Sequence, residues 1–199
     1  MLMNNFSDSI FEAGVDEAGR GSLAGPVTAA AVILPKNYKN KYLDDSKRLS
    51  EKKRIELKYI IENNSIDFAV CSITPAVIDK INILNSTFRA MHGALNNLKI
   101  IPNFIIVVGN KFKKFKKVNH KCIVKGDRKY QNIAAASILA KTYRDLYMIE
   151  QHDRFPYFGW DKNKGYGTKY HINSIFKHGF TTLHRKSFTI KKSQIKLEL

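Results

Sequence analysis

The sequence predicts an α/β fold, in which a mixed β-sheet carries helices on its faces. Three observations favour this class. The chain has 199 residues, 44% of them hydrophobic, which is enough for one domain with a sizeable core. Two apolar segments near the N-terminus are rich in small and β-branched residues, as buried strands are. Strand-like and helix-like segments then alternate along the chain, as they do where helices cover a sheet.

The first expected elements are two strands joined by a glycine-rich turn. Residues 11–17 form an apolar segment that ends in two acids, and the turn from Gly19 to Gly25 follows. Residues 27–34 form a continuous apolar run that Pro35 ends. The pattern predicts two buried neighbouring strands with a turn of unusual backbone freedom between them.

Helical signals alternate with a strand over the next fifty residues. Ser50 is a predicted N-cap, and the helix that it opens should run to about residue 63. Residues 67–73 are typical of a strand. Pro75 fits the first turn of a second helix, which we expect to extend to about residue 98.

The second half contains one apolar strand, over residues 103–108, and then a basic loop or ribbon over 111–125. A long helix is expected over 131–153. A short helix over 168–178 should end at Gly179, since glycine commonly follows the last helical residue. The last dozen residues are polar and basic.

The charge is strongly positive and unevenly spread. The net charge is +17, and residues 101–199 hold most of it, with 21 Lys and Arg against 6 Asp and Glu. A basic half favours a polyanionic partner such as nucleic acid. The alternative is compositional drift, because the chain has 26 Lys but 8 Arg and is rich in Ile and Asn, the residues of AT-rich codons.

Other classes find no support in the sequence. No apolar run approaches the roughly 20 residues of a membrane-spanning helix, and the N-terminus lacks the pattern of a secretory signal. Cys71 and Cys122 form no close-spaced motif, which fits a reducing compartment. Zinc-ligand spacing, a P-loop, a nucleophile elbow and a dinucleotide fingerprint are all missing. We expect a cytoplasmic protein without membrane contact.

The first strand ends in chemistry-bearing residues. Asp16 and Glu17 are adjacent acids, and three glycines follow them within eight residues. Carboxylates beside bare backbone N–H groups suit a hard divalent cation that faces a phosphate, because Mg²⁺ and Mn²⁺ prefer oxygen ligands. An ordinary surface turn that happens to carry two acids is the alternative.

This turn resembles the first motif of bacterial ribonuclease HII, and further motifs of that family follow in the family's order across residues 13–188. The later segments are similar to DSK-x-LS, KGD…IAAASILAK…RD, GYGT and HR-x-SF, and they lie at residues 45–50, 125–145, 165–168 and 184–188.

The resemblance implies a ribonuclease H-like fold: a mixed five-stranded sheet flanked by helices, with a C-terminal helical part. It implies a catalytic domain over residues 1–188 and a basic tail over 189–199. The implied activity is an endonuclease that hydrolyses the RNA strand of RNA–DNA hybrids and cleaves 5′ of ribonucleotides embedded in duplex DNA, as in ribonucleotide excision repair. Two divalent cations, Mn²⁺ or Mg²⁺, would serve the reaction. We expect a monomer.

The resemblance also implies the site residues. The catalytic and metal-binding carboxylates would be Asp16, Glu17 and Asp145. Substrate contacts would come from Gly19, Arg20, Gly21, Lys47 and Tyr166. For Asp145, the residues alone equally fit a helix-surface acid that pairs with Lys141 one turn earlier. For Tyr166, they fit an ordinary turn tyrosine.

One position departs from the family pattern. The family usually has Asp-Gly-Asn after the strand over 103–108, whereas this chain has Val108-Gly109-Asn110. Valine has no lone pair and cannot bind a metal. Three interpretations stay open: an enzyme with weakened metal affinity, a catalytically impaired hybrid-binding protein of the same fold, or an engineered or sequencing change. Rescue of the missing ligand by the nearby Asp127 is speculative.

Two basic segments suggest further contacts. Residues 111–129 hold nine Lys or Arg, with Phe112 and Phe115 interleaved, which fits either a phosphate-contacting face or a solvated loop. The tail Gln194–Leu199 resembles the short peptides that dock on the bacterial sliding clamp. The alternative for the tail is a frayed terminus without a partner.

Overall fold

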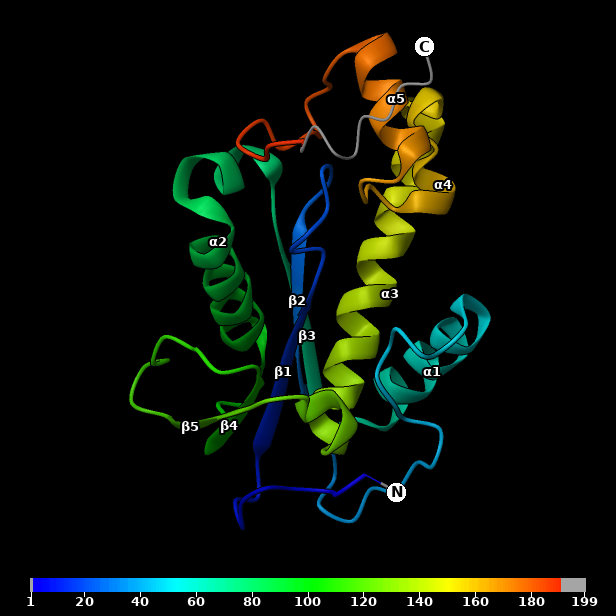
Figure 1. Cartoon of the computed structure of the whole chain (residues 1–199). Helices are drawn as coiled ribbons and strands as arrows, with labels where there is room; N and C mark the ends of the chain where they lie inside the picture. Colours follow the sequence, from blue (N-terminus) through cyan, green and yellow to red (C-terminus); the bar gives the residue numbers. More distant parts are fainter. Residues whose placement is uncertain (1, 191–199) are drawn as a thin grey trace.

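A five-stranded mixed sheet forms the centre of the structure, a computed structural model that describes residues 2–190 (Figure 1). Its order is β3-β2-β1-β4-β5. Strand β2 runs antiparallel to its neighbours β1 and β3, whereas β4 lies parallel to both β1 and β5. The strands are β1 (Glu12–Ala18), β2 (Val27–Ile33), β3 (Asp67–Ile73), β4 (Phe104–Val108) and β5 (Asn119–Ile123).

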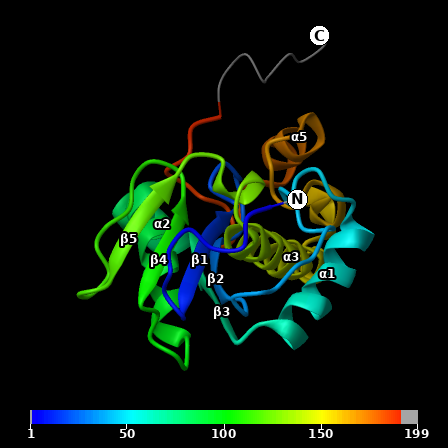
Figure 2. The same ribbon diagram turned by 90° about the horizontal axis from the view of Figure 1, so that it is seen from below.

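Helices cover both faces of this sheet. Seen from below, α2 lies on one side, while α3 lies on the other with α1 beside it (Figure 2). Two shorter helices, α4 and α5, follow α3 and form the C-terminal part (Figure 1). The helices are α1 (Glu51–Asn64), α2 (Pro75–Asn97), α3 (Gln131–Arg154), α4 (Trp160–Asn163) and α5 (Lys169–His178). The fold class expected from the sequence is therefore confirmed.

A very close helix-to-strand approach involves Gly14 in β1. A Cβ atom at this position would lie 2.2 Å from the backbone carbon of Asn132 in α3. Such a contact is impossible, so only glycine lets α3 cross β1 at this depth. The alanine-rich start of α3, with Ala134, Ala135 and Ala136 all fully buried, fits the same short separation. This packing sets the position of α3 beside the acids at the end of β1.

Two local features differ from the sequence expectation. Strand β5 lies inside the segment that we expected to be a basic loop or ribbon. Helix α2 is not continuous, because Asn82 has φ 64° and ψ 167° and kinks it. The Asn82 side chain accepts a hydrogen bond from the N–H of Asn85 at 3.0 Å, as an N-cap does, so a second helical segment begins there.

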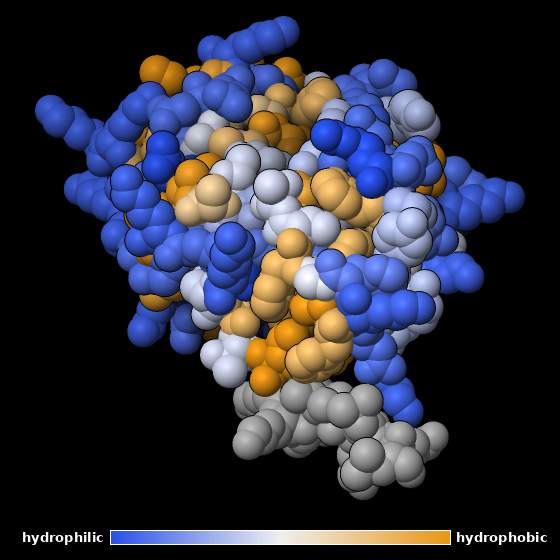
Figure 3. All heavy atoms as spheres, turned by 90° about the horizontal axis from the view of Figure 1, so that it is seen from above, coloured by the Kyte–Doolittle hydropathy of each residue, from blue (hydrophilic) through white to orange (hydrophobic). Residues whose placement is uncertain are grey.

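A separate apolar cluster supports the C-terminal part. Trp160 is fully buried and Phe158 almost so, and their rings stack at 5.2 Å. From above, hydrophobic side chains gather in the middle of this end of the molecule, within a largely hydrophilic rim (Figure 3).

Within residues 2–190, no helix has the length and apolar character to cross a membrane.

Candidate active site

A cleft of about 770 Å³ opens at the carboxyl ends of the parallel strands β1 and β4. The sheet supplies acids and one valine to it, the β1–β2 turn supplies bare backbone, and α3 closes one side. The residues that line it include Asp16, Glu17, Gly19, Arg20, Gly21, Lys47, Val108, Asp127, Lys141 and Tyr166. Most residues singled out from the sequence thus meet in one place, although they are spread widely along the chain.

Asp16 and Glu17 form the acidic centre of the cleft. Asp16 is 5% exposed and accepts a hydrogen bond from the backbone N–H of Glu17 at 2.6 Å. Burial, reinforced by the neighbouring charge of Glu17, raises the pKa of Asp16 well above its usual range. Burial also raises the pKa of Glu17, against the lowering influence of Arg20 at 3.3 Å. The two carboxylates are therefore poorly neutralised by the protein itself.

Val108 stands beside this pair on the neighbouring strand. In the parallel register Val15 lies opposite Val107, so Asp16 and Val108 follow as the next residues of the two strands. Alternate residues of a strand share a face. Asp16 shares its face with Gly14, and Val108 shares its face with Ile106, both of which pack toward α3. A carboxylate at position 108 would consequently project into the cleft next to Asp16.

Asp127 is the third acid of the cleft, although the sequence alone assigns it only a speculative role. It lies in a short 3₁₀ turn, Gly126–Arg128, between β5 and α3. Burial and the nearby charge of Asp45 raise its pKa, and its negative charge contributes to the raised pKa of Asp16. Asp127 is thus electrostatically coupled to the acidic centre.

Asp145 does not line the cleft, contrary to the expected ligand set. Its carboxylate is buried and forms ion pairs with Lys141 at 2.8 Å and with Arg54 of α1 at 3.3 Å. It borders a separate small hollow between α1 and α3. The physical reason is its position on α3: one turn beyond Lys141, it faces α1 instead of β1. The alternative interpretation, an acid that pairs with Lys141, describes its placement.

The acids of the cleft do not enclose a preformed metal cage. Across residues 2–190, no three His, Cys, Asp or Glu side chains gather closely enough to surround an ion on their own. Asp16 and Glu17 supply adjacent oxygen donors, and Val108 occupies the place from which a further donor would come.

Two buried arginines shape the glycine-rich turn. Gly19 has φ 88°, and a Cβ there would lie 2.0 Å from Nε of Arg144. Arg144 donates to the carbonyls of Pro26, Lys164 and Ala24 at 2.9 to 3.0 Å. Arg185 donates to the carbonyls of Gly25 and Arg20, both at 2.9 Å. The backbone carbonyls of the turn are therefore held by buried guanidinium groups, while Arg20 and Gly21 stay exposed.

Tyr166 and Lys47 complete the cleft from two loops. The Lys141 ammonium and the Arg144 guanidinium each lie 5.3 Å from the centre of the Tyr166 ring. The loop of Lys47 is held by its neighbours: Asp45 pairs with Arg128 at 2.8 Å, and Ser46 hydrogen-bonds Ser137 of α3 at 2.9 Å. Both side chains are thus presented by loops that are anchored elsewhere.

The basic segment after β4 has a buried and an exposed side. Phe115 is 3% exposed, and Phe112 lies edge-on to Phe88 of α2. The lysines at 111, 113, 114, 116 and 117 are exposed. The interleaved phenylalanines therefore anchor the segment on α2, which leaves the lysines as the phosphate-contacting candidates.

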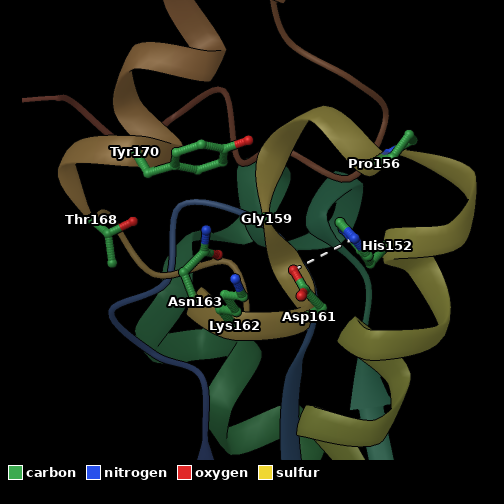
Figure 4. A pocket seen from close by; sticks show the side chains of 8 residues that line it. All are labelled: His152, Pro156, Gly159, Asp161, Lys162, Asn163, Thr168 and Tyr170. Carbon is green, nitrogen blue, oxygen red and sulfur yellow. Dashed lines mark ion pairs between the residues drawn. The ribbon is translucent and has the colours of Figure 1, made fainter.

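A second hollow, of about 590 Å³, lies beside α4 and α5 (Figure 4). His152 and Asp161 face one another across 3.5 Å there, and Thr168 and Tyr170 approach from the start of α5 (Figure 4). Asp161 is the one acid among its described lining residues, so this hollow lacks the paired carboxylates of the cleft at β1 and β4.

The chain is similar to known proteins over nearly its whole length. The family model described as Ribonuclease HII matches residues 13–191. A Ribonuclease HII of Christiangramia forsetii is 54% identical over 197 residues, which are 99% of this chain and 100% of that protein. The ribonuclease H2 of Pyrococcus horikoshii superposes with a TM-score of 0.75 at 26% identity, over 89% of this chain and 93% of that one.

A second solved structure, the complex of PCNA with RNase HII from Archaeoglobus fulgidus, has a TM-score of 0.76 at 23% identity. The match covers 91% of this chain and 96% of that one. At this identity the likeness supports the fold alone.

Proposed function

The chain belongs to the ribonuclease HII family, and we propose that it is an endonuclease that cleaves RNA–DNA hybrids and cuts 5′ of single ribonucleotides in duplex DNA. The observation that carries the proposal is the cleft itself. It combines the buried Asp16 and the partly buried Glu17 with the exposed Arg20 and Gly21 and with Tyr166, within a strongly basic molecule. Cleavage would leave a 3′-hydroxyl and a 5′-phosphate.

Divalent cations fit the acids of the cleft. All the donors are carboxylate oxygens, which Mg²⁺ and Mn²⁺ prefer. The raised pKa of Asp16 and of Glu17 indicates that their negative charge lacks a sufficient partner within the protein. We assign Asp16, Glu17 and Asp127 to the cations. We leave Asp145 out, because its carboxylate already forms ion pairs with Lys141 and Arg54. When bound, the cations supply an activated water and a stabilised leaving oxygen.

The remaining residues would bind and orient the nucleic acid. Backbone N–H groups of the Gly19–Gly21 turn and the side chain of Arg20 would contact the 2′-hydroxyl and the flanking phosphates. The 2′-hydroxyl is the group that distinguishes RNA from DNA. Tyr166 would stack on the sugar that follows the ribonucleotide, and Lys47 would contact a phosphate.

Val108 favours a second candidate, a hybrid-binding protein with impaired catalysis. The substitution leaves the nucleic-acid-facing residues in place but removes an oxygen donor next to Asp16. Binding would persist while cation affinity and turnover fall. Cleavage of a duplex with one embedded ribonucleotide, measured against Mg²⁺ and Mn²⁺ concentration, separates the two candidates.

Asp16→Asn provides the matched control for that assay. The substitution keeps the side-chain size but removes the charge, so we expect it to abolish cleavage and to preserve duplex binding. A variant that cleaves as the parent does would refute the assignment of the acidic centre.

The clamp-docking hypothesis for Gln194–Leu199 falls outside the described residues and stays a prediction. The archaeal neighbour was solved in complex with PCNA. Affinity of the clamp from the same organism for the full chain and for a chain that ends at Ser193 tests the hypothesis. Equal affinities would exclude it.

A further inference from the structure

Two buried histidines connect the C-terminal segment to the cleft. His171 in α5 is fully buried, and His184 is 2% exposed. Their Nε2 atoms lie 3.2 Å apart, although the two residues are separated by 13 positions. Aromatic rings surround them, with Phe158 edge-on to His184 at 4.8 Å and Trp160 edge-on to His171 at 6.1 Å. Buried polar groups of this kind are stable only when each finds a partner.

The partners determine where each proton lies. The backbone N–H of Thr181 is 2.9 Å from Nδ1 of His184 and can only donate, so that nitrogen is the acceptor. The neutral His184 ring therefore carries its proton on Nε2, which faces His171. The indole N–H of Trp160 is 3.0 Å from Nε2 of His171 and also can only donate. His171 consequently carries its proton on Nδ1.

The Nδ1 proton of His171 is directed at Tyr166, which lines the cleft. Nδ1 of His171 lies 2.9 Å from the carbonyl oxygen of Tyr166, which completes a chain of donors from Thr181 through His184 and His171 to Tyr166. The lone pair of His171 Nε2 is shared by two donors, the indole N–H of Trp160 and the Nε2–H of His184. Neither ring has room for a second proton, since each acceptor nitrogen already faces an N–H group. The burial that lowers the pKa of both histidines supports the neutral forms.

The Tyr166 carbonyl needs such a fixed donor because glycines flank it. Gly165 has φ 81°, and Gly167 follows Tyr166 directly, so the local backbone is intrinsically free. The carbonyl also accepts from the N–H of Thr168 at 2.8 Å. Figure 4 shows Thr168 at the start of α5, the helix that carries His171.

We propose that His171 and His184 are positioning residues, which fix the peptide of Tyr166 and thereby the place of its ring over the sugar that follows the ribonucleotide. His171 makes the contact, and the N–H groups of Trp160 and His184 together hold His171 in the tautomer that can donate. The inference rests on the proposed function, because it assigns Tyr166 a role in recognising the ribonucleotide. Neither histidine lines the cleft, so their effect would pass through Tyr166.

The tautomers can be measured without any substrate. Long-range ¹H–¹⁵N NMR spectra of the full chain near pH 7 should show His171 protonated on Nδ1 and His184 protonated on Nε2. The opposite tautomer at either residue, or a doubly protonated ring, would overturn the relay.

Two substitutions of His171 separate positioning from packing. In His171→Asn the amide nitrogen replaces Nδ1 and can still donate to Tyr166. In His171→Gln the amide reaches the Nε2 position and leaves the Tyr166 carbonyl without that donor. His178→Asn, on an exposed histidine of the same helix, is the matched control. The readout is the ratio of Kd values for an all-DNA duplex and a duplex with one ribonucleotide, in non-cleaving Ca²⁺.

We expect His171→Asn and His178→Asn to keep the parent's ratio, and His171→Gln to lower it about tenfold, as loss of orientation does. In a Tyr166→Ala background, His171→Gln should have no further effect. Equal ratios for His171→Asn and His171→Gln, or additive losses in the double variant, would overturn the inference. A parent that does not prefer the ribonucleotide would instead refute the proposed function, and the role of Tyr166 with it.

Discussion

Asp145 and Lys141 form a partly buried ion pair at 2.8 Å, one helical turn apart on α3. Arg54 of α1 approaches the same carboxylate at 3.3 Å and also donates to the carbonyls of Ser46 and Leu49. Asp145 thus connects α3 to α1 and to the loop that carries Lys47. We therefore expect Asp145 to act as a structural acid.

Asp145→Asn should therefore reduce stability more than cation binding. The change leaves Arg54 and Lys141 without their shared charge, and we expect about 2 to 4 kcal/mol less free energy of unfolding. Mn²⁺ affinity, measured by calorimetry on the folded variant, should stay close to that of the parent. Asp127→Asn is the matched comparison and should weaken Mn²⁺ binding with little loss of stability. The reverse pattern would restore Asp145 to the ligand set.

Val108→Asp should increase cleavage, most clearly at low Mg²⁺. A carboxylate at this position would stand beside Asp16 and add an oxygen donor. Without cations, a further negative charge beside Asp16, Glu17 and Asp127 should lower the free energy of unfolding by about 2 kcal/mol. Excess Mg²⁺ should recover that loss. Val108→Asn controls for size without charge, and identical metal dependence for parent, Asn and Asp variants would contradict the prediction.

The lysines after β4 should govern the salt dependence of binding. Replacing Lys111, Lys113 and Lys114 by alanine should lower the slope of log K against log salt by about 0.9 for each phosphate that the variant no longer neutralises. The preference for a ribonucleotide should not change, because phosphate contacts carry no base or sugar identity. Lys99→Ala, at the opposite end of β4, is the control. An unchanged slope in the triple variant would indicate that the segment is a solvated loop without phosphate contacts.

The buried His184 should make the protein less stable in mild acid. Burial, followed by the nearby His171, lowers the pKa of His184 to about 4. An unfolded histidine titrates near 6.5, so between about pH 6.5 and 4 the unfolded chain binds a proton that the native state rejects. Stability is complete above that window and falls as the pH decreases through it, by up to about 3 kcal/mol.

Urea unfolding of the parent and of His184→Gln over that pH range tests the prediction. His171 is the titratable group that faces His184, since its other ring neighbours, Phe158, Trp160 and Phe180, are uncharged. The glutamine variant should lose less stability on acidification, and parallel curves would show that His184 does not contribute.

Sequence patterns predicted the strands that carry continuous or alternating apolar side chains. Residues 27–33 and 67–73 form strands within one residue of the expected bounds, because continuous or alternating apolar runs are diagnostic there. Strand β5 escaped prediction because Asn119–Ile123 is a polar edge strand in which only Ile123 is buried. An edge strand with one lysine and one histidine resembles a loop in a basic sequence.

From the residues alone, the site was predictable only where its members are adjacent in the sequence, whereas Lys47 and Tyr166 were predicted from the family resemblance. The Asp-Glu pair and the glycine turn could be recognised because they are adjacent in the sequence. From the sequence, Asp145 is expected in the ligand set, and Asp127 has only a speculative role. Which acid lies in the cleft depends on the side of α3 that faces β1, and that depends on the close approach at Gly14. The pairing of His171 with His184 likewise follows from tertiary packing, which no spacing in the sequence encodes.

The two buried arginines beneath the glycine-rich turn have a consequence for the electric field in the cleft. Within residues 2–190, neither Arg144 nor Arg185 forms an ion pair with a carboxylate, and both donate to backbone carbonyls. Their charges are consequently not cancelled, and their burial protects them from the mobile ions that screen surface charges. As the salt concentration rises, the charges of the exposed lysines would be screened first. The attraction that then persists for a phosphate at Gly19–Gly21 would originate from this interior pair of cations.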